Sequence, residues 1–251
     1  MKETLLRYVL LAVFATVAVS GYGDGKVDYD KMETLVTNKL VFLSQNVMVH
    51  NYLNYVKQQT GATNVDVADC LGRFIMRSAS AEPGTKEFSC CRTAIWLFAE
   101  ISEDRQMKVL ADVAERQDNR TACNALYYYY RRMREKRGLE LVERLLEKET
   151  LGTNVCREVS VVLRMDAADG FGRNDGHRTA LTAFAKRLLE RRKHLKLADS
   201  LMLKLDNGYD RSERRRRLAE DVATDRIPDM VDSHRRYFKD ALKSMDRREE
   251  K

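Results

Sequence analysis

The strongest constraint on the fold is a helical spacing of apolar residues that continues along nearly the whole chain. Apolar side chains recur in steps of three and four, and no segment shows sustained alternation between apolar and polar residues. The 251 residues include only two prolines and twelve glycines, and Leu, Ala, Glu, Lys and Arg, which favour helices, are frequent. We therefore predict an all-α fold without a sheet.

The first twenty residues differ from the rest and are typical of an export signal. Lys2 and Arg7 flank the start of an uncharged run at 8–19, and Ser20 ends a small-residue cleavage site. The run is shorter than the roughly 20 apolar residues of a spanning helix, and no later stretch is long and apolar enough. We expect a signal peptide at 1–20, export to the periplasm or the cell exterior, and no transmembrane span in the mature chain; an uncleaved anchor is the alternative.

The remaining chain divides into a helical body at 21–169 and a basic C-terminal part at 177–251. Apolar residues of 177–205 follow a heptad seam, which predicts one long helix that pairs with another as in a coiled coil. We expect this helix and those after it to form a long-helix antiparallel hairpin. The helices predicted are 31–59, 65–77, 86–101, 103–116, 121–136, 139–149, 154–165, 177–205, 212–223 and 229–245.

Three cysteines, Cys91, Cys123 and Cys156, mark a weak internal repeat with spacings of 32 and 33 residues. The positions three, six and seven residues after each cysteine are apolar, and all lie on one helix face. We expect each unit to be a hairpin of two helices, the first of which buries this stripe. The equivalent residues are Ala94, Leu126 and Val159; Leu97, Tyr129 and Val162; and Phe98, Tyr130 and Leu163.

A two-helix unit of this length resembles HEAT- or TPR-like helical repeats over about residues 85–169. The resemblance is one of architecture, because no repeat consensus matches. A stack of such hairpins would present a surface to a protein or peptide partner. A compact irregular helical bundle is the alternative that the spacing leaves open.

The formal net charge of +7 is concentrated in the C-terminal helices, since residues 186–251 hold 20 basic and 14 acidic residues. Guanidinium groups suit carboxylates and phosphates, so this part could contact an acidic partner, an anionic polymer or a membrane surface. The alternative is a solvated face of internal ion pairs. No aromatic residues are interleaved with the arginines, and we expect no nucleic-acid partner. The candidate residues are Arg187, Arg191, Arg192, Arg214, Arg215, Arg216 and Arg217.

Four consecutive tyrosines, Tyr127, Tyr128, Tyr129 and Tyr130, form a second candidate binding feature. On a helix they point in four directions, so we expect two in the core and two at the surface. An exposed tyrosine supplies both apolar area and a hydroxyl to a partner. Packing against a neighbouring helix is the alternative.

The loop after the body holds the only cluster of candidate metal ligands, Asp166, Asp169, Asp175 and His177. Its oxygens could hold Ca²⁺ and support a metal-dependent enzyme, whereas a plain connector would use the same residue types. No zinc-protease or serine-hydrolase motif is present. We therefore expect a non-enzymatic interaction or scaffold protein that uses no cofactor.

The five cysteines allow two interpretations. After export, a disulfide could join Cys70 to Cys91, or to the adjacent Cys90, across the turn at 82–84. Alternatively, all five are small buried apolar side chains, the usual state of free cysteine.

Overall fold

The computed structural model describes residues 27–39, 46–148, 152–168, 175–224, 226–227 and 230–249. These residues form twelve α-helices, one π-helical segment and one 3₁₀ turn, with no strand among them, and the all-α prediction is confirmed. The predicted export signal at 1–20 lies outside the described residues. No helix in this part of the chain is long and apolar enough to cross a membrane.

Most helices are short and follow one another through brief connections. A π-helical segment, Arg134–Gly138, continues α7, and the 3₁₀ turn Tyr209–Arg211 precedes α12. The α-helices are α2 (Tyr29–Lys39), α3 (Asn46–Thr60), α4 (Asn64–Ser78), α5 (Lys86–Ile101), α6 (Lys108–Arg116), α7 (Arg120–Met133), α8 (Leu139–Glu147), α9 (Thr153–Ala167), α10 (Asp175–Glu190), α11 (Leu195–Leu205), α12 (Glu213–Ala223) and α13 (Asp232–Glu249).

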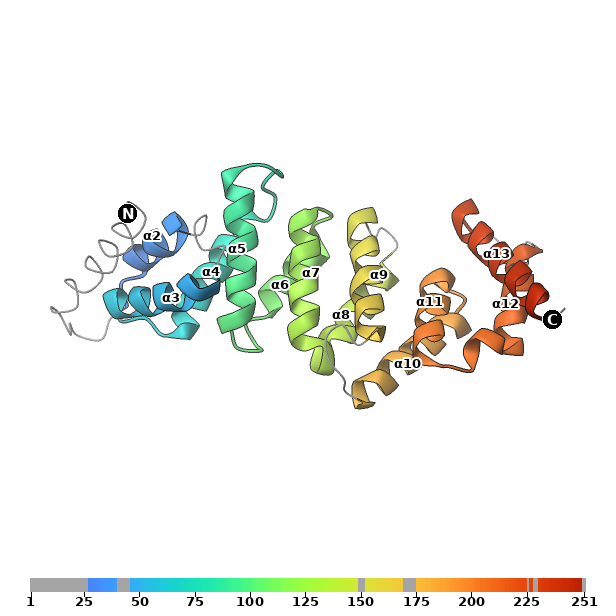
Figure 1. The fold of residues 1–251 in the computed structure, drawn as a ribbon. Coiled ribbons are helices and arrows are strands. Elements are labelled where there is room, and N and C mark those ends of the chain that lie inside the picture. Colours follow the sequence, from blue (N-terminus) through green and yellow to red (C-terminus); the bar gives the residue numbers. More distant parts are fainter. Residues whose placement is uncertain are drawn as a thin grey trace, which may run out of the picture.

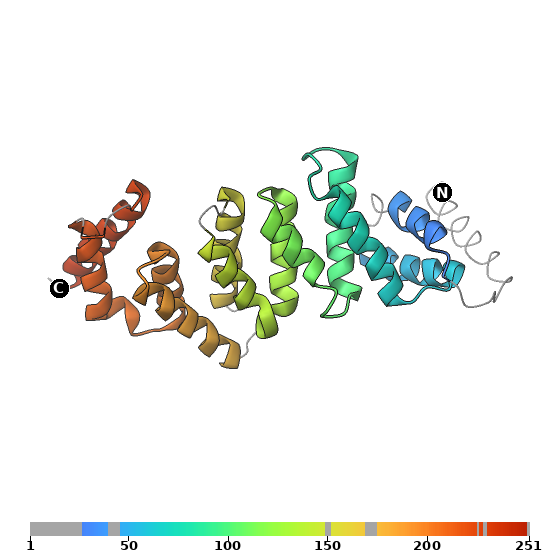
Figure 2. The same ribbon diagram turned by 180° about the vertical axis from the view of Figure 1, so that it is seen from behind.

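The helices form an elongated row with α2 and α13 at opposite ends (Figures 1 and 2). Successive helices pair as hairpins: α4 packs along α5, α6 along α7, α10 along α11 and α12 along α13. Helices α5, α7 and α9 stand side by side, and α9 contacts α11. One continuous core of buried residues runs from Met32 in α2 to Phe238 in α13. The arrangement is therefore a row of helical hairpins rather than a compact bundle.

The apolar stripe of the 32/33 spacing occupies equivalent places on α5, α7 and α9. All nine residues of the stripe are buried, among them Phe98, Tyr130 and Leu163 with no exposed surface. One detail of the prediction is wrong, because the helix with the stripe is the second of its hairpin and not the first. Leu110 and Val113 of α6 are buried, and α6 packs along α7 rather than along α5.

Several helices begin at side chains that satisfy their free backbone N–H groups. Thr63 and Asp66 form a reciprocal capping box at α4, and the hydroxyl of Thr85 accepts a hydrogen bond from the N–H of Phe88 at α5. Between these two helices the chain turns at Gly84, whose φ of +93° is a conformation that L side chains rarely adopt. The turn brings α4 and α5 into the first large hairpin contact.

The predicted helix over 31–59 is wrong, because the chain folds back between α2 and α3. The hydroxyl of Tyr52 in α3 donates a hydrogen bond to the backbone oxygen of Leu35 in α2. In one continuous helix these residues would lie about 25 Å apart. Folding back lets the apolar sides of both helices enter the same core.

The predicted long helix over 177–205 is also wrong, because α10 ends at Glu190 and α11 starts at Leu195. Arg192 and His194 adopt positive φ angles of 53° and 49°, which reverse the chain direction. The apolar residues of the predicted seam are still mostly buried, since α10 and α11 pack on each other. Arg191 lies in the turn with half of its side chain exposed, which keeps its charge in solvent.

Candidate functional site

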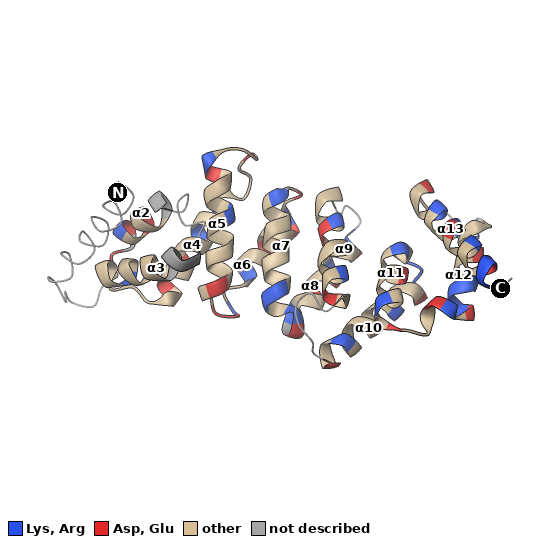
Figure 3. Ribbon diagram, in the orientation of Figure 1, with Lys and Arg blue, Asp and Glu red and all other residues tan. Residues whose placement is uncertain are grey.

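All seven arginines predicted to bind a partner take part in ion pairs with carboxylates of this chain. The pairs mostly join different helices, and Figure 3 shows the mixed charge of the C-terminal helices. Each of these guanidinium groups has a carboxylate partner within the chain, so anion binding by this group stays a prediction. The pairs are Arg187 with Glu143; Arg191 with Glu143 and Glu147; Arg192 with Asp221; Arg214 with Glu190; Arg215 with Asp199 and Asp210; Arg216 with Glu220 and Asp246; and Arg217 with Glu213.

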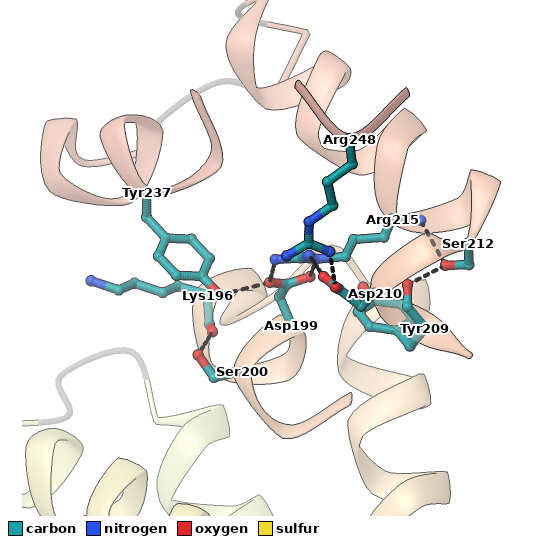
Figure 4. Close-up of polar contacts among 9 residues, drawn as sticks. All are labelled: Lys196, Asp199, Ser200, Tyr209, Asp210, Ser212, Arg215, Tyr237 and Arg248. Carbon is teal, nitrogen blue, oxygen red and sulfur yellow. Dashed lines mark hydrogen bonds and ion pairs between the residues drawn. The ribbon is translucent and has the colours of Figure 1, made fainter. Parts of the chain in front are cut away.

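Arg215 lies in the core and forms a buried polar cluster with Asp199 (Figure 4). Its Nε lies 3.1 Å from Asp199 Oδ1 and its Nη2 lies 3.3 Å from Oδ2, so the guanidinium donates two hydrogen bonds to the carboxylate. The hydroxyl of Tyr237 donates to Asp199 Oδ2 at 2.7 Å. A second carboxylate, Asp210, accepts hydrogen bonds from Arg215 and from Arg248.

This cluster fastens the last helices of the row to one another. Its members come from α11, the 3₁₀ turn, α12 and α13 (Figure 4). Hydrogen bonding to Arg248, followed by the charges of Arg215 and Arg248, lowers the pKa of Asp210 against the effect of burial. Burial together with the charge of Asp199 raises the pKa of Tyr237 to about 12. These polar groups satisfy one another and therefore act as a structural clamp.

A second buried cluster surrounds Asp166 at the end of α9. Tyr130 donates its hydroxyl to Asp166 Oδ2 at 2.6 Å, and Arg134 Nη1 lies 3.2 Å from Oδ1. The Nε2 atom of His177 contacts Oδ2 as well. Burial opposes ionisation of this carboxyl, but the hydrogen bonds from His177 and Tyr130 and the charge of Arg134 outweigh it and lower the pKa. The cluster ties α7 and its π-helical extension to α9 and α10.

Of the predicted metal ligands, the structure brings Asp166 and His177 together. Asp175 is exposed at the start of α10, and Asp169 lies outside the described residues. Within the described ranges, no group of three or more His, Cys, Asp or Glu side chains could hold a metal ion. Both oxygens of Asp166 already contact side chains of the protein, and a metal site in this loop stays a prediction.

The variant D166N is expected to be less stable at neutral pH by about 1.5–3 kcal/mol, the usual contribution of hydrogen bonds to a charged group. Because the native pKa of Asp166 lies below its ordinary value of about 3.9, its ionised form stabilises the fold above that pH. That stabilisation is lost as the pH falls through the native pKa. Urea denaturation at neutral pH and at about pH 3 should show a smaller acid loss for D166N than for the parent.

The matched control for this prediction is D112N, which changes a carboxylate in an (i, i+4) ion pair with Lys108 on α6. It should change stability by less than about 1 kcal/mol. An equal loss of stability in acid for the parent and for D166N would contradict the role assigned to Asp166.

All five cysteines are free thiols in the structure, and Cys70, Cys90 and Cys91 are buried. Burial, followed by the charge of Glu87, raises the pKa of Cys91 to about 12, so this thiol is held in its neutral form. Three of the five cysteines are thus buried thiols, whereas Cys123 and Cys156 are half-buried, and the Cys70–Cys91 disulfide stays a prediction.

The four tyrosines divide as their helical positions imply. Tyr129 and Tyr130 are buried, whereas Tyr127 and Tyr128 are half-buried and form an edge-to-face pair with centroids 5.2 Å apart. Tyr127 and Tyr128 therefore keep part of their surface accessible to a partner.

Tyr128 belongs to a set of equivalent half-buried apolar residues, which we call the outer row: Trp96, Tyr128 and Val161. Each lies five residues after Cys91, Cys123 or Cys156, and α5, α7 and α9 stand side by side (Figure 1). The three residues thus occupy equivalent positions on three neighbouring helices. Sequence reasoning missed Trp96 and Val161, although the same 32/33 spacing could have found them.

No protein-family model matches the chain, and comparison with curated proteins and with solved structures gives no significant similarity. A function must therefore be argued from the residues and their geometry.

Proposed function

We propose that this chain is an exported, non-enzymatic helical-repeat protein that binds a protein or peptide partner on the outer face of α5, α7 and α9. The observation that carries the proposal is the outer row, in which three equivalent apolar side chains remain half-buried across neighbouring helices. Stacked helical hairpins use such extended faces for binding.

The composition of the outer row suits a protein contact. Trp and Tyr combine a large apolar area with a polar group, and they are enriched at the energetic centres of interfaces. Trp96 and Tyr128 also pack against the core, so their positions are largely fixed before a partner binds. A preformed anchor loses little conformational entropy on binding.

The two buried polar clusters support a non-enzymatic role. The charged groups around Asp199 and Asp166 are paired with one another inside the protein. The alternative contact through the C-terminal arginines is less favoured, because carboxylates of the chain already compete for them.

The test of the binding proposal is a triple variant with W96A, Y128A and V161S. Peptides are selected from a displayed random library on the parent chain, and their affinity for parent and variant is measured by fluorescence anisotropy. We expect the triple variant to lose at least about tenfold in affinity, since interface aromatics commonly contribute more than 1 kcal/mol each. Helix content, measured by circular dichroism, should stay close to that of the parent.

A control variant, M76A, removes an apolar side chain of α4. Met76 has an exposed fraction of 37%. The variant should leave peptide affinity unchanged. Peptides that bind the triple variant as tightly as the parent would contradict the proposal.

The export part of the proposal has its own readout. N-terminal sequencing of the protein from its native cell should find a chain that begins after Ser20. A chain that retains Met1 and lies inside the cell would contradict export without touching the binding test.

A further inference from the structure

We infer that the outer face of α5, α7 and α9 selects an acidic protein segment that carries apolar side chains. This inference depends on the proposed function, because it names the chemistry of the partner for the same face. It arises from exposed arginines that flank the outer row on these helices, which we call the outer arginines: Arg92, Arg131, Arg157 and Arg164.

The outer arginines occupy repeat positions on both sides of the outer row. Arg92 and Arg157 lie one residue after Cys91 and Cys156, while Arg131 and Arg164 lie eight residues after Cys123 and Cys156. Positions one, five and eight are related by steps of four and three and share one helix side. Arginine therefore flanks the outer row at one position on α5, at one position on α7 and at both positions on α9.

The charges of the outer arginines act on titratable groups of their own helix and of the neighbouring helix. Burial raises the pKa of Tyr128, while the positive charges of Arg131 and of Arg92 on the neighbouring helix act in the opposite direction. Charge effects from Glu158 and Arg157 reach Cys123 in the same way, across α7 and α9. Together with their repeat positions on neighbouring helices, these effects assign the arginines and the outer row to one face of α5, α7 and α9.

The outer arginines differ from the C-terminal arginines in their partners. Among the described residues, none of the four forms an ion pair with a carboxylate. Arg92 lies over the ring of Phe88 at 5.9 Å, and Arg164 Nε donates to the backbone oxygen of Ser160. Their charges are consequently available to a partner, whereas each of the seven candidate arginines of the C-terminal part already contacts a carboxylate.

Acidic side chains are scarce on this face. In the described part of α7 and α9, no acidic side chain is exposed, because Asp166 is buried and Glu158 is half-buried. Burial raises the pKa of Glu158, and the charge of Arg157 partly offsets that rise. On α5, Glu100 is exposed near Tyr128. The positive excess lies over α7 and α9, where a partner's carboxylates would find bidentate donors.

The test uses three labelled peptides of equal length in which leucines are flanked by glutamate, by glutamine or by lysine. Fluorescence anisotropy with the full chain should show tightest binding for the glutamate peptide, about tenfold tighter than for the glutamine peptide. This preference should disappear in about 1 M salt, where the screening length is about 3 Å. The lysine peptide should bind most weakly.

A double variant with R131E and R164E should reverse the order and favour the lysine peptide. The control R116E changes an exposed arginine of α6, which is not one of the three helices of the outer face. It should keep the parent's order of peptide affinities. If the double variant loses helix content in circular dichroism, the neutral pair R131Q and R164Q should abolish the preference instead.

The outcomes separate the two proposals. Equal binding of the glutamate and glutamine peptides, no binding of any of the three peptides, or an unchanged order in the double variant overturns the acidic partner. Binding of the glutamine peptide that still depends on Trp96 and Tyr128 leaves the proposed function standing. Binding that ignores W96A and Y128A would overturn the proposed function itself.

Discussion

The variant D199A is expected to lower the free energy of unfolding by about 3–5 kcal/mol, because it leaves a buried guanidinium without its carboxylate. Asp199 has no exposed surface, and Arg215 has only 7% of its surface exposed. The substitution also removes the acceptor of the Tyr237 hydroxyl, which lies 2.7 Å from the carboxylate. Chemical denaturation followed by circular dichroism measures the change.

The control for this prediction is E190A, which breaks an exposed ion pair with Arg214 on the same group of helices. Exposed pairs contribute about 0–1 kcal/mol, so E190A should be close to the parent. Hydrogen exchange adds a local readout, since in a row of hairpins the loss should appear first in α11, α12 and α13. Equal stability of D199A and E190A would show that the buried cluster is not a clamp.

The variant F98A is expected to lower the free energy of unfolding by about 3–5 kcal/mol, the usual range for a buried phenylalanine. The ring of Phe98 is fully buried, and its atom Cε2 would lie 3.3 Å from a Cβ placed at Gly72 on α4. Removing it leaves a cavity between α4 and α5 that the tight hairpin contact cannot fill. Denaturation of the full chain measures this loss.

The matched comparison is L163A, at the equivalent position of α9. It should cost about 2–5 kcal/mol, because Leu163 is also fully buried. Tyr128 lies five residues after its repeat cysteine, whereas Phe98 and Leu163 lie seven residues after theirs. The variant Y128A should lower the free energy of unfolding less, since the ring of Tyr128 is half-buried. A smaller loss for F98A than for Y128A would contradict the assignment of Phe98 to the buried apolar stripe of the 32/33 spacing.

The sequence was sufficient for local structure at the turn between α4 and α5. The predicted bounds of α5 match the structure, because Pro83-Gly84 and Thr85 set its start. The two long predicted helices failed for a shared physical reason. A helix that continues and a helix that folds back onto itself both keep apolar residues at steps of three and four. In addition, neither 40–45 nor 191–194 contains a glycine or a proline that would signal a break.

The candidate sites were predicted in part. The spacing of Cys91, Cys123 and Cys156 defines a register that also contains the outer row. Tyr128 was therefore predicted as a candidate, and Trp96 and Val161 could have been predicted from the same register. Ion pairs within a helix, such as Arg217 with Glu213, follow the ion-paired alternative that the sequence left open. Pairs between helices were beyond sequence reasoning, since Arg191 and its partner Glu143 are 48 residues apart. A count of arginines therefore could not show that the candidate arginines of the C-terminal helices have carboxylate partners in the fold.

The single-file order of the hairpins bears on how such a chain can change over generations. Each hairpin packs mainly on the ones before and after it, and α5, α7 and α9 meet through like surfaces. Duplicating the segment from α6 to α7 would insert one more hairpin between existing neighbours and lengthen the outer row by one residue. The length of the row could thus evolve in whole hairpins, without redesign of either end.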